Sequence, residues 1–321
     1  MERMCCISVI VLVFVSLSVA CGGDDGQTLK PSGLEPQTAV TLRTGDITAV
    51  FVDNSAFGPH HRAGYNGIAE LYHTEQDSSL FVPAYAGYNI EHYFGGDSLQ
   101  ELFEPRRHPM ELYRSGDQEV LLYQPPTPVS GVESLTRFVL EPPHYIDVTF
   151  RCVFHSEDIF QHGYAGIFWA SYINAPADRH IYFPGHPEED GQETWIRAFS
   201  EKHGVRSTHR WEQDDSPLFF AENFNVVLAS HFSEYRFTRP FYFGRFHNMA
   251  YALLFDSRER IRFSQSPTGG GDRNPAWDFQ LIVRDYQLEN IYSYHARIVY
   301  KPFISREDIR REYEVWKAAE E

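Results

Sequence analysis

The segment "HYIDVTFRCVFH", from His144 to His155, alternates apolar and polar side chains from Ile146 to Cys152. Consecutive side chains of a β-strand point to opposite faces of the sheet, so this alternation predicts a strand with one buried and one solvent-facing side. We expect the buried side to carry Ile146, Val148, Phe150, Cys152 and Phe154, and the other side to carry Asp147, Thr149, Arg151 and His155.

Similar short runs, rich in β-branched and aromatic residues and bounded by Gly, Pro, Asp or Asn, recur along the chain and predict further strands. They lie at 47–53, 67–73, 119–124, 135–140, 164–173, 225–231, 249–256, 277–285 and 292–300. No helical pattern separates these runs, which favours antiparallel sheets over alternating strands and helices. The sequence therefore predicts an all-β protein, built as a large antiparallel β-sandwich.

The last residues, "SREDIRREYEVWKAAEE", predict one helix over 305–320. Ser305, followed three positions later by Asp308, is typical of a helix N-terminus. Three apolar residues recur at helical spacing on one face: Ile309, Tyr313 and Trp316. A helix with a single apolar face packs against another element, so we expect it to lie on the outside of a sheet.

The first residues predict export. A charged start is followed by an apolar run that is too short to span a bilayer, so residues 1–20 are interpreted as a signal peptide. The sequence "LSVAC" resembles the bacterial lipoprotein cleavage box, which would make Cys21 the lipidated N-terminus. Residues 21–38 would then be a flexible tether and residues 39–321 a single domain. We expect a lipid-anchored protein that faces the periplasm or the cell surface, with ordinary secretion as the alternative.

The cysteine count, the net charge and the aromatic content limit which disulfides and which binding partners we expect. Cys5 and Cys6 fall within the signal peptide, so Cys152 is the single cysteine of the expected domain and cannot form an internal disulfide. The net charge of −16 opposes binding to nucleic acid and to anionic lipid surfaces. The aromatic content of 15% suits β-sheets first and sugar-stacking surfaces second. The sequence makes no prediction of oligomeric state.

Five segments combine glycine with Arg, His, Asn, Asp or aromatic residues. They are "FGPHHRAGYNGIAELYH" (57–73), "FVPAYAGYNIEHYFGGD" (81–97), "HGYAGIFWASYINAP" (162–176), "FGRFHNMAY" (243–251) and "FSQSPTGGGDRNPAWDF" (263–279). Each segment could be a polar turn, but together they offer the flat stacking surfaces and forked polar groups that a hydroxyl-rich ring requires. None contains a phosphate-binding loop, a GxSxG elbow or an HExxH motif. We therefore expect no cofactor and no metal, although histidines from separate strands could still assemble a metal site.

These segments, the aromatic strands and the run "WDFQLIVRDYQLENIYSYHARIVYKPF" resemble the galactose mutarotase-like superfamily, in particular its uncharacterised exported bacterial members, over about 47–303. The resemblance implies a β-supersandwich fold. Aldose epimerases of this superfamily use a histidine as acid and a carboxylate as base to open and reclose a sugar ring. Their Asn-His-x-Tyr-Phe-Asn run is absent here, and the superfold also hosts lyases, glycoside hydrolase domains and non-catalytic modules.

General acid-base chemistry on a sugar needs a proton donor and acceptor within reach of the ring, which selects the candidate residues. The catalytic candidates are His61, His92 and His247, with Glu91 or Asp278 as the carboxylate partner. The candidates for holding the sugar are Arg62, Arg245 and Arg273, which would orient hydroxyls or neutralise a uronate, with Tyr65, Asn66, Tyr93, Trp169 and Trp277.

Two functions remain open at this point. One is an exported enzyme acting on a sugar or oligosaccharide, with epimerase, lyase and hydrolase unresolved. The other is a carbohydrate-binding or structural surface lipoprotein without catalysis. Convergence of three polar segments in one concave pocket would favour the enzyme, whereas a shallow aromatic strip would favour the binding protein.

The lipid anchor leads to a direct test. If Cys21 carries the lipid, Cys21→Ser removes the acceptor thiol, so labelling with a radioactive fatty acid should disappear and the protein should leave the membrane fraction. Cys152→Ser serves as the control, because that residue lies within the expected domain. Unchanged labelling of the Cys21→Ser variant would contradict the lipoprotein interpretation.

Overall fold

The alternating segment forms strand β9 (Tyr145–Phe154) in a computed structural model that describes residues 28–189, 191–215 and 217–320. Strand β9 pairs antiparallel with β8 (Val132–Glu141) on one side and with β19 (Ile291–Pro302) on the other. All five apolar residues of its predicted buried face are buried, so the predicted register is confirmed.

Within the described residues, the main sheet has 16 strands, and the order of 15 of them is β1-β6-β7-β8-β9-β19-β16-β15-β11-β14-β13-β17-β18-β10-β5, while β12 pairs with β11. The bounds not yet given are β1 (Pro36–Gln37), β5 (Asn89–Phe94), β6 (Glu111–Arg114), β7 (Glu119–Gln124), β10 (Tyr164–Ala170), β11 (Ile181–Pro187), β12 (Thr194–Ala198), β13 (Thr208–Trp211), β14 (Phe232–Phe237), β15 (Phe241–Phe246), β16 (Met249–Phe255), β17 (Ile261–Ser266) and β18 (Ala276–Arg284). A second sheet contains β2 (Ala39–Thr44), β3 (Ile47–Val52) and β4 (Gly67–His73). The all-β prediction is confirmed.

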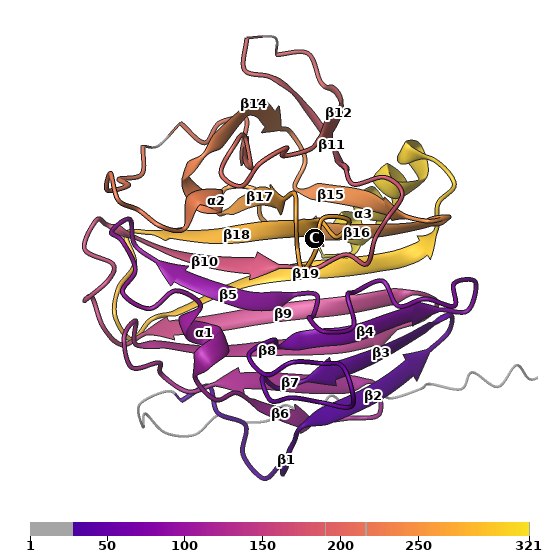
Figure 1. Cartoon of the computed structure of the whole chain (residues 1–321), viewed down its shortest axis with the longest axis horizontal. Helices are drawn as coiled ribbons and strands as arrows, with labels where there is room; N and C mark the ends of the chain where they lie inside the picture. The colour runs from indigo at the N-terminus through magenta and orange to yellow at the C-terminus, as the bar shows by residue number, and fades with distance from the viewer. Residues whose placement is uncertain (1–27, 190, 216, 321) are drawn as a thin grey trace, which may run out of the picture.

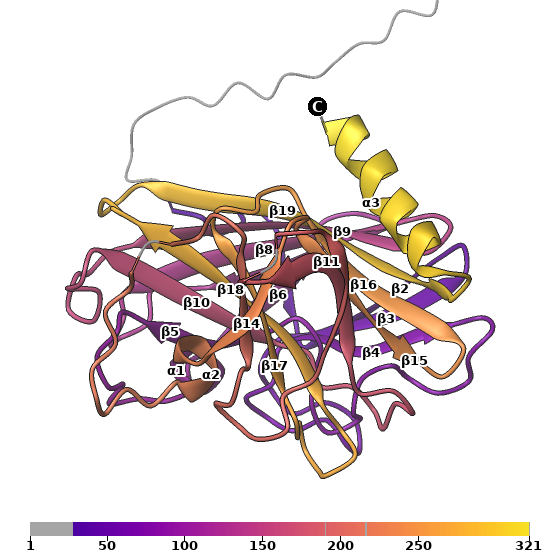
Figure 2. The same cartoon turned by 90° about the horizontal axis from the view of Figure 1, so that it is seen from above.

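The large sheet curls over itself, and its two halves pack face to face (Figures 1 and 2). Trp169 on β10 contacts Phe150 on β9 with ring centroids 4.8 Å apart, and it meets Tyr294 on β19 at 5.5 Å. Trp169 also stacks on Phe279 of the neighbouring β18 at 4.8 Å. These aromatic side chains fill the space between the layers and form the centre of the core.

The C-terminal helix α3 (Arg306–Glu320) agrees with the sequence prediction. The hydroxyl of Ser305 accepts a hydrogen bond from the amide of Asp308 at 3.1 Å, as an N-cap does. Its predicted apolar face is buried against β15, β16 and β19, on the outside of the sheet. In Figure 2, α3 lies on the opposite side of the molecule from two short helices, α1 (Glu104–Arg107) and α2 (Val227–Ser230).

The predicted strand at 225–231 is wrong, because this stretch contains helix α2. The carbonyl oxygen of Leu228 accepts hydrogen bonds from the hydroxyls of Thr208 and Ser264, which lie on β13 and β17. These contacts replace the ladder bonds that a strand would need, so tertiary hydrogen bonding outweighs the apolar character of the segment.

The described chain is attached to the domain from its first residues. The amide of Leu29 donates to the buried carboxylate of Glu133 at 3.1 Å, and the side chain of Leu29 packs with Tyr113 and Tyr123. Docked chain therefore extends well before residue 39, where the sequence placed the end of the tether. Among the described residues, no helix is long and apolar enough to cross a membrane.

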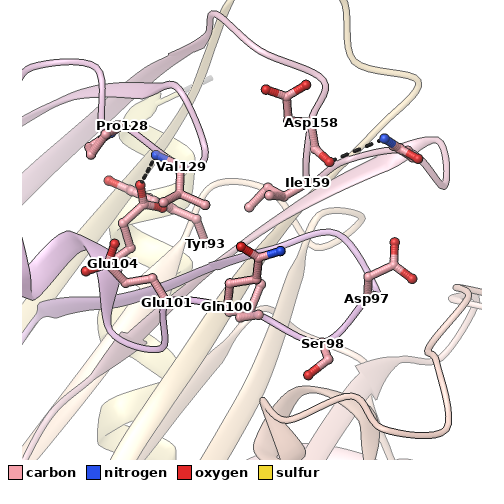
Figure 3. Close-up of a pocket in the computed structure, with 12 residues that line it drawn as sticks. Tyr93, Asp97, Ser98, Gln100, Glu101, Glu104, Pro128, Val129, Asp158 and Ile159 are labelled. Carbon is pink, nitrogen blue, oxygen red and sulfur yellow. Dashed lines mark hydrogen bonds between the residues drawn. The ribbon is translucent and has the colours of Figure 1, made fainter.

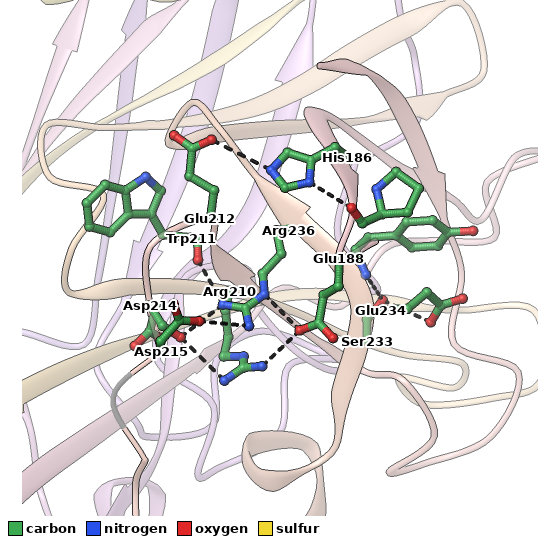
Figure 4. A network of polar contacts seen from close by, with 12 residues as sticks. His186, Glu188, Arg210, Trp211, Glu212, Asp214, Asp215, Ser233, Glu234 and Arg236 are labelled. Carbon is green, nitrogen blue, oxygen red and sulfur yellow. Dashed lines mark hydrogen bonds and ion pairs between the residues drawn. The ribbon is translucent and has the colours of Figure 1, made fainter. Parts of the chain in front are cut away.

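Ion pairs fix the β13–β14 region. Figure 4 shows the guanidinium of Arg236 between the carboxylates of Glu188, at 2.8 Å, and Asp215, at 3.1 Å. Asp214 binds Arg262 at 2.8 Å and also contacts Arg284, which joins the loop after β13 to β17 and β18. Burial raises the pKa of Asp214, but the two guanidinium groups outweigh it and hold that pKa below its ordinary value.

This network predicts unequal effects of two neighbouring substitutions. Asp214→Ala leaves the guanidinium of Arg262, which is 1% exposed, without its counter-charge and should lower the free energy of unfolding by about 3–5 kcal/mol. Asp215→Ala is the matched control, because its side chain is 80% exposed and should matter by less than about 1 kcal/mol. Chemical denaturation measures both, and equal effects would show that the buried pair does not hold the loop.

Candidate functional site

A cavity of about 230 Å³ lies on the outer face of the layer formed by β17, β18, β10 and β5. Its floor carries Glu91, His92, Ala170, Ala276 and Asp278. Side chains alternate along β10 and β18, and because Trp169, Trp277 and Phe279 point into the core, their neighbours Ala170 and Asp278 point into the cavity.

Strand β5 carries one extra residue at the floor. His92 pairs with Phe168 and Ile90 pairs with Trp169, so Glu91 has no partner in the register with β10. Such a β-bulge re-aims a side chain and is common next to active sites. As a result, the adjacent residues Glu91 and His92 both line the cavity.

Two segments form the walls. Leu102 and Phe103 come from the loop before α1, and residues 226–228 come from the start of α2. The side chain of Asn225 joins the two walls, because its amide oxygen accepts from the backbone amide of Leu99 at 2.8 Å and its amide nitrogen donates to the carbonyl of the same residue at 2.9 Å.

Glu91 is a buried carboxylate with two donors. It accepts hydrogen bonds from the hydroxyl of Tyr172 at 2.8 Å and from the guanidinium of Arg106 at 3.3 Å. Burial raises the pKa of Glu91, and the positive charge of Arg106 partly opposes that rise. These contacts favour an ionised carboxylate in a desolvated site.

The pKa of Asp278 is raised more strongly than that of Glu91. It is fully buried, its Oδ1 accepts from the amide of Ser171 at 3.2 Å, and its Oδ2 has no hydrogen-bond partner. Burial and then the negative charge of Glu91 raise the pKa of Asp278 well above its ordinary value. The floor therefore holds two buried carboxyl groups near each other, and burial favours the protonated form most strongly in Asp278, the one with an unengaged oxygen.

His92 lies in the same floor as a neutral ring. Burial and the nearby charge of Arg106 lower the pKa of His92 to about 3. Its Nδ1 accepts from the amide of Phe103 at 3.4 Å, so the neutral ring carries its hydrogen on Nε2. It can donate a hydrogen bond at neutral pH.

A cluster of aromatic side chains packs beside Glu91. Tyr65, Tyr85 and Tyr172 contact one another with ring centroids 4.5 to 5.5 Å apart, and the guanidinium of Arg106 lies 3.8 Å from the ring centre of Tyr65. A side chain at Gly270 would collide with the ring of Tyr85, so the glycine turn at 269–271 allows the close approach of this loop.

Four of the five polar segments of the sequence therefore meet here. The first supplies Tyr65 to the supporting cluster, the second Glu91 and His92, the third Tyr172, and the fifth Asp278. The fourth segment, 243–251, forms the turn between β15 and β16 and does not reach the cavity.

The predicted stacking roles of Trp169, Trp277 and Tyr93 are corrected by the structure. Both tryptophans are fully buried in the core, and the indole of Trp277 donates to the carbonyl of Arg179 at 3.2 Å. Tyr93 is 1% exposed and donates its hydroxyl to the side chain of Gln124 at 2.7 Å. The two tryptophans fill space between the layers, whereas Tyr93, although almost fully buried, is among the residues that line a second cavity.

Asn66 and His61 hold loops together. The amide of Asn66 is fully buried and bonds to the side chain of Asn89 and to both backbone groups of Ile90. The two ring nitrogens of His61 each lie 3.0 Å from a backbone carbonyl oxygen, of Tyr85 and of Tyr65. Neither side chain lines the cavity, in contrast to the sequence prediction.

The other predicted residues also lie elsewhere. Arg62 and Arg273 are exposed, His247 is exposed in the β15–β16 turn with a φ of 54°, and Arg245 lies over the ring of Phe303. None of them lines the cavity, so the structure does not assign them to this site. Cys21 lies outside the described residues.

Two residues of the site were missed in the sequence. Tyr172 is in the quoted third segment, but an isolated tyrosine near a strand end carries no catalytic signal. Arg106 is in "FEPRRHP" (103–109), which reads as a polar loop, and its role depends on the contact with Glu91 that only the fold creates.

A second, more acidic cavity lies on the other side of the 94–108 loop. It has a volume of about 470 Å³ and contains Asp97, Glu101, Glu104 and Asp158 (Figure 3). The oxygen Oε1 of Glu104 accepts from the amides of Val129 and Ser130, and the other three carboxylates are exposed or half-buried. This cavity has no unpartnered buried acid like Asp278 among its described residues.

Two groups of side chains have the composition of a metal site. In Asp46–His73–His144, the Nδ1 of His73 accepts from the amide of Glu75, so in the neutral ring the Nε2 that faces the group carries hydrogen rather than a free lone pair. In Glu101–Glu104–His108, the imidazole already binds Glu101 at 3.2 Å. Neither group is assigned to a metal.

Comparisons with known proteins give similarities of shape. No family model and no curated protein matches the chain. A galactose mutarotase related enzyme from Lactobacillus acidophilus is 8% identical, with a TM-score of 0.48 and coverage of 83% of this chain and 100% of its own. A galactose mutarotase-like protein from Lactobacillus casei is 8% identical, with a TM-score of 0.47 and coverage of 82% and 99%. An α-N-acetylgalactosaminidase from Bifidobacterium bifidum is 9% identical, with a TM-score of 0.49 and coverage of 88% and 39%.

Proposed function

We propose that the protein is a carbohydrate-active enzyme whose site is the cavity between β5, β18 and α2. The observation that carries this proposal is the convergence of Glu91, His92 and Asp278 on one floor, from strands far apart in the sequence. The sugar class follows from the sequence resemblance and from the size of the cavity, which is below the usual range of about 300–1,000 Å³ and suits a single ring.

In this proposal the two carboxyl groups divide the proton transfers. Asp278, whose protonated form is favoured by burial and by the charge of Glu91, donates a proton to an oxygen of the sugar as general acid, while Glu91, whose ionised form is favoured by Arg106 and Tyr172, accepts one as general base. Tyr172 and Arg106 position the base and balance its charge. This division revises the sequence hypothesis, in which a histidine exchanged the proton.

His92 has a different role in this scheme. A ring with a pKa of about 3 is a weak base at neutral pH, but its Nε2–H can bind a hydroxyl or a developing negative charge. We assign it to orienting the sugar rather than to proton transfer.

The alternative, a binding protein without catalysis, depended on exposed tryptophans and tyrosines. Of its four stacking residues, Trp169, Trp277 and Tyr93 are buried, and the ring of half-buried Tyr65 is covered by the guanidinium of Arg106, so the four supply no aromatic strip. Desolvating two carboxyl groups costs free energy that a simple binding surface would not require. The export and lipid anchoring expected from residues 1–21 stay proposals.

The proposal predicts a bell-shaped dependence of turnover on pH. Turnover should fall at low pH as Glu91 becomes protonated and at high pH as Asp278 loses its proton, with both limbs above the ordinary carboxyl range. Glu91→Gln and Asp278→Asn should each reduce kcat by about 100-fold or more. The measurement is a turnover screen over mono- and oligosaccharides, followed by pH profiles on the best substrate.

Asp158→Asn is the matched control, because this carboxylate lies in the acidic cavity on the other side of the loop. Its turnover should equal that of the unmodified protein. Full activity in both floor variants, with intact folding by circular dichroism, would exclude the carboxyl pair. Loss of activity in Asp158→Asn alone would move the site to the other cavity.

A further inference from the structure

The distribution of polar groups in the cavity is uneven. The carboxyl Oδ2 of Asp278 is buried without a hydrogen-bond partner among the described residues, and the hydrogen bond of His92 is made by its Nδ1, which leaves Nε2 for a ligand; both side chains belong to the floor. The polar side chains of the rim bind one another, because the two ring nitrogens of His203 lie within hydrogen-bond distance of the hydroxyls of Thr268 and Ser266.

The wall opposite the floor is apolar. It consists of Leu102, Val226, Val227 and Leu228. The one amide side chain of this wall, Asn225, uses its oxygen and its nitrogen on the backbone of Leu99. Val226 is 3% exposed and Val227 37%, so the wall is dry at Val226 and open at Val227, and a hydroxyl or an amide placed against it would find no free polar side chain.

The cavity also has no free positive charge. No Arg or Lys is among the described residues that line it, and the nearby guanidinium of Arg106 is held by Glu91 and by the ring of Tyr65. A carboxylate, sulfate or phosphate on the ligand would face Glu91 without a counter-charge.

We propose that the substrate is an uncharged 6-deoxyhexose, whose methyl group lies against Val227 and its neighbours while its hydroxyls face the floor. This inference rests on the proposed function and names its substrate class. A methyl group matches the wall, whereas a hydroxymethyl group buries an unpaired hydroxyl and an acetamido group buries an unpaired amide.

Three sugars with one ring and different groups at C6 test this inference: D-fucose, D-galactose and D-galacturonate. A second series with the gluco configuration covers the other stereochemistry: 6-deoxy-D-glucose, D-glucose and D-glucuronate. Titration calorimetry with the purified protein should show the deoxy sugar of one series binding at least about tenfold more tightly than its hydroxymethyl counterpart. The uronate of that series should bind most weakly.

Val227→Thr adds a hydroxyl to the wall with little change of shape, so it should reduce the deoxy-over-hydroxymethyl ratio by several-fold. Val315→Thr, the same change at a position on α3 that does not line the cavity, should leave the ratio unchanged. Equal or tighter binding of the hydroxymethyl sugar or the uronate overturns this inference and leaves the enzyme proposal standing. Absence of binding by all six sugars overturns both.

Discussion

Trp169 of β10 stacks on Phe279 of the neighbouring strand β18, on the inner face of one layer of the curled sheet. The site depends on this contact. Side chains alternate along a strand, so fixing these rings in the core also fixes Ala170 and Asp278 on the outer face. A register slip of one residue would move a carboxyl group into the aromatic core and a tryptophan into the cavity. Core packing and the position of the acid are therefore one constraint.

Burial of the two carboxyl groups of the site costs free energy. Glu91 and Asp278 are buried near each other, and burial raises the pKa of both. In the folded state Asp278 retains its proton to higher pH than in the unfolded chain, so its contribution to stability falls as the pH rises above the ordinary carboxyl range. Well-packed cores do not need such groups, which is why perturbed carboxyls in a cavity indicate chemistry.

Regular patterns in the sequence predicted local structure correctly, whereas contacts between distant segments could not be predicted from it. The alternation in β9 and the cap and apolar face of α3 were predicted residue by residue, because each depends on local spacing. Strand β5 was missed, and strict alternation would have placed Glu91 and His92 on opposite faces. The bulge opposite β10 brings them together, and it arises from pairing between distant segments. The same limit applies to the tryptophans, whose composition suits a core and a sugar site equally well.

The central claim is that the floor carrying Glu91, His92 and Asp278 binds a sugar ring. A crystal structure of the protein soaked with the sugar that binds best in titration tests it most directly. The account predicts density for one ring above this floor, with a hydroxyl within hydrogen-bonding distance of the Oδ2 of Asp278. Density for the sugar in the acidic cavity beside Glu104, or over the exposed surface around Arg62, with an empty floor would contradict it.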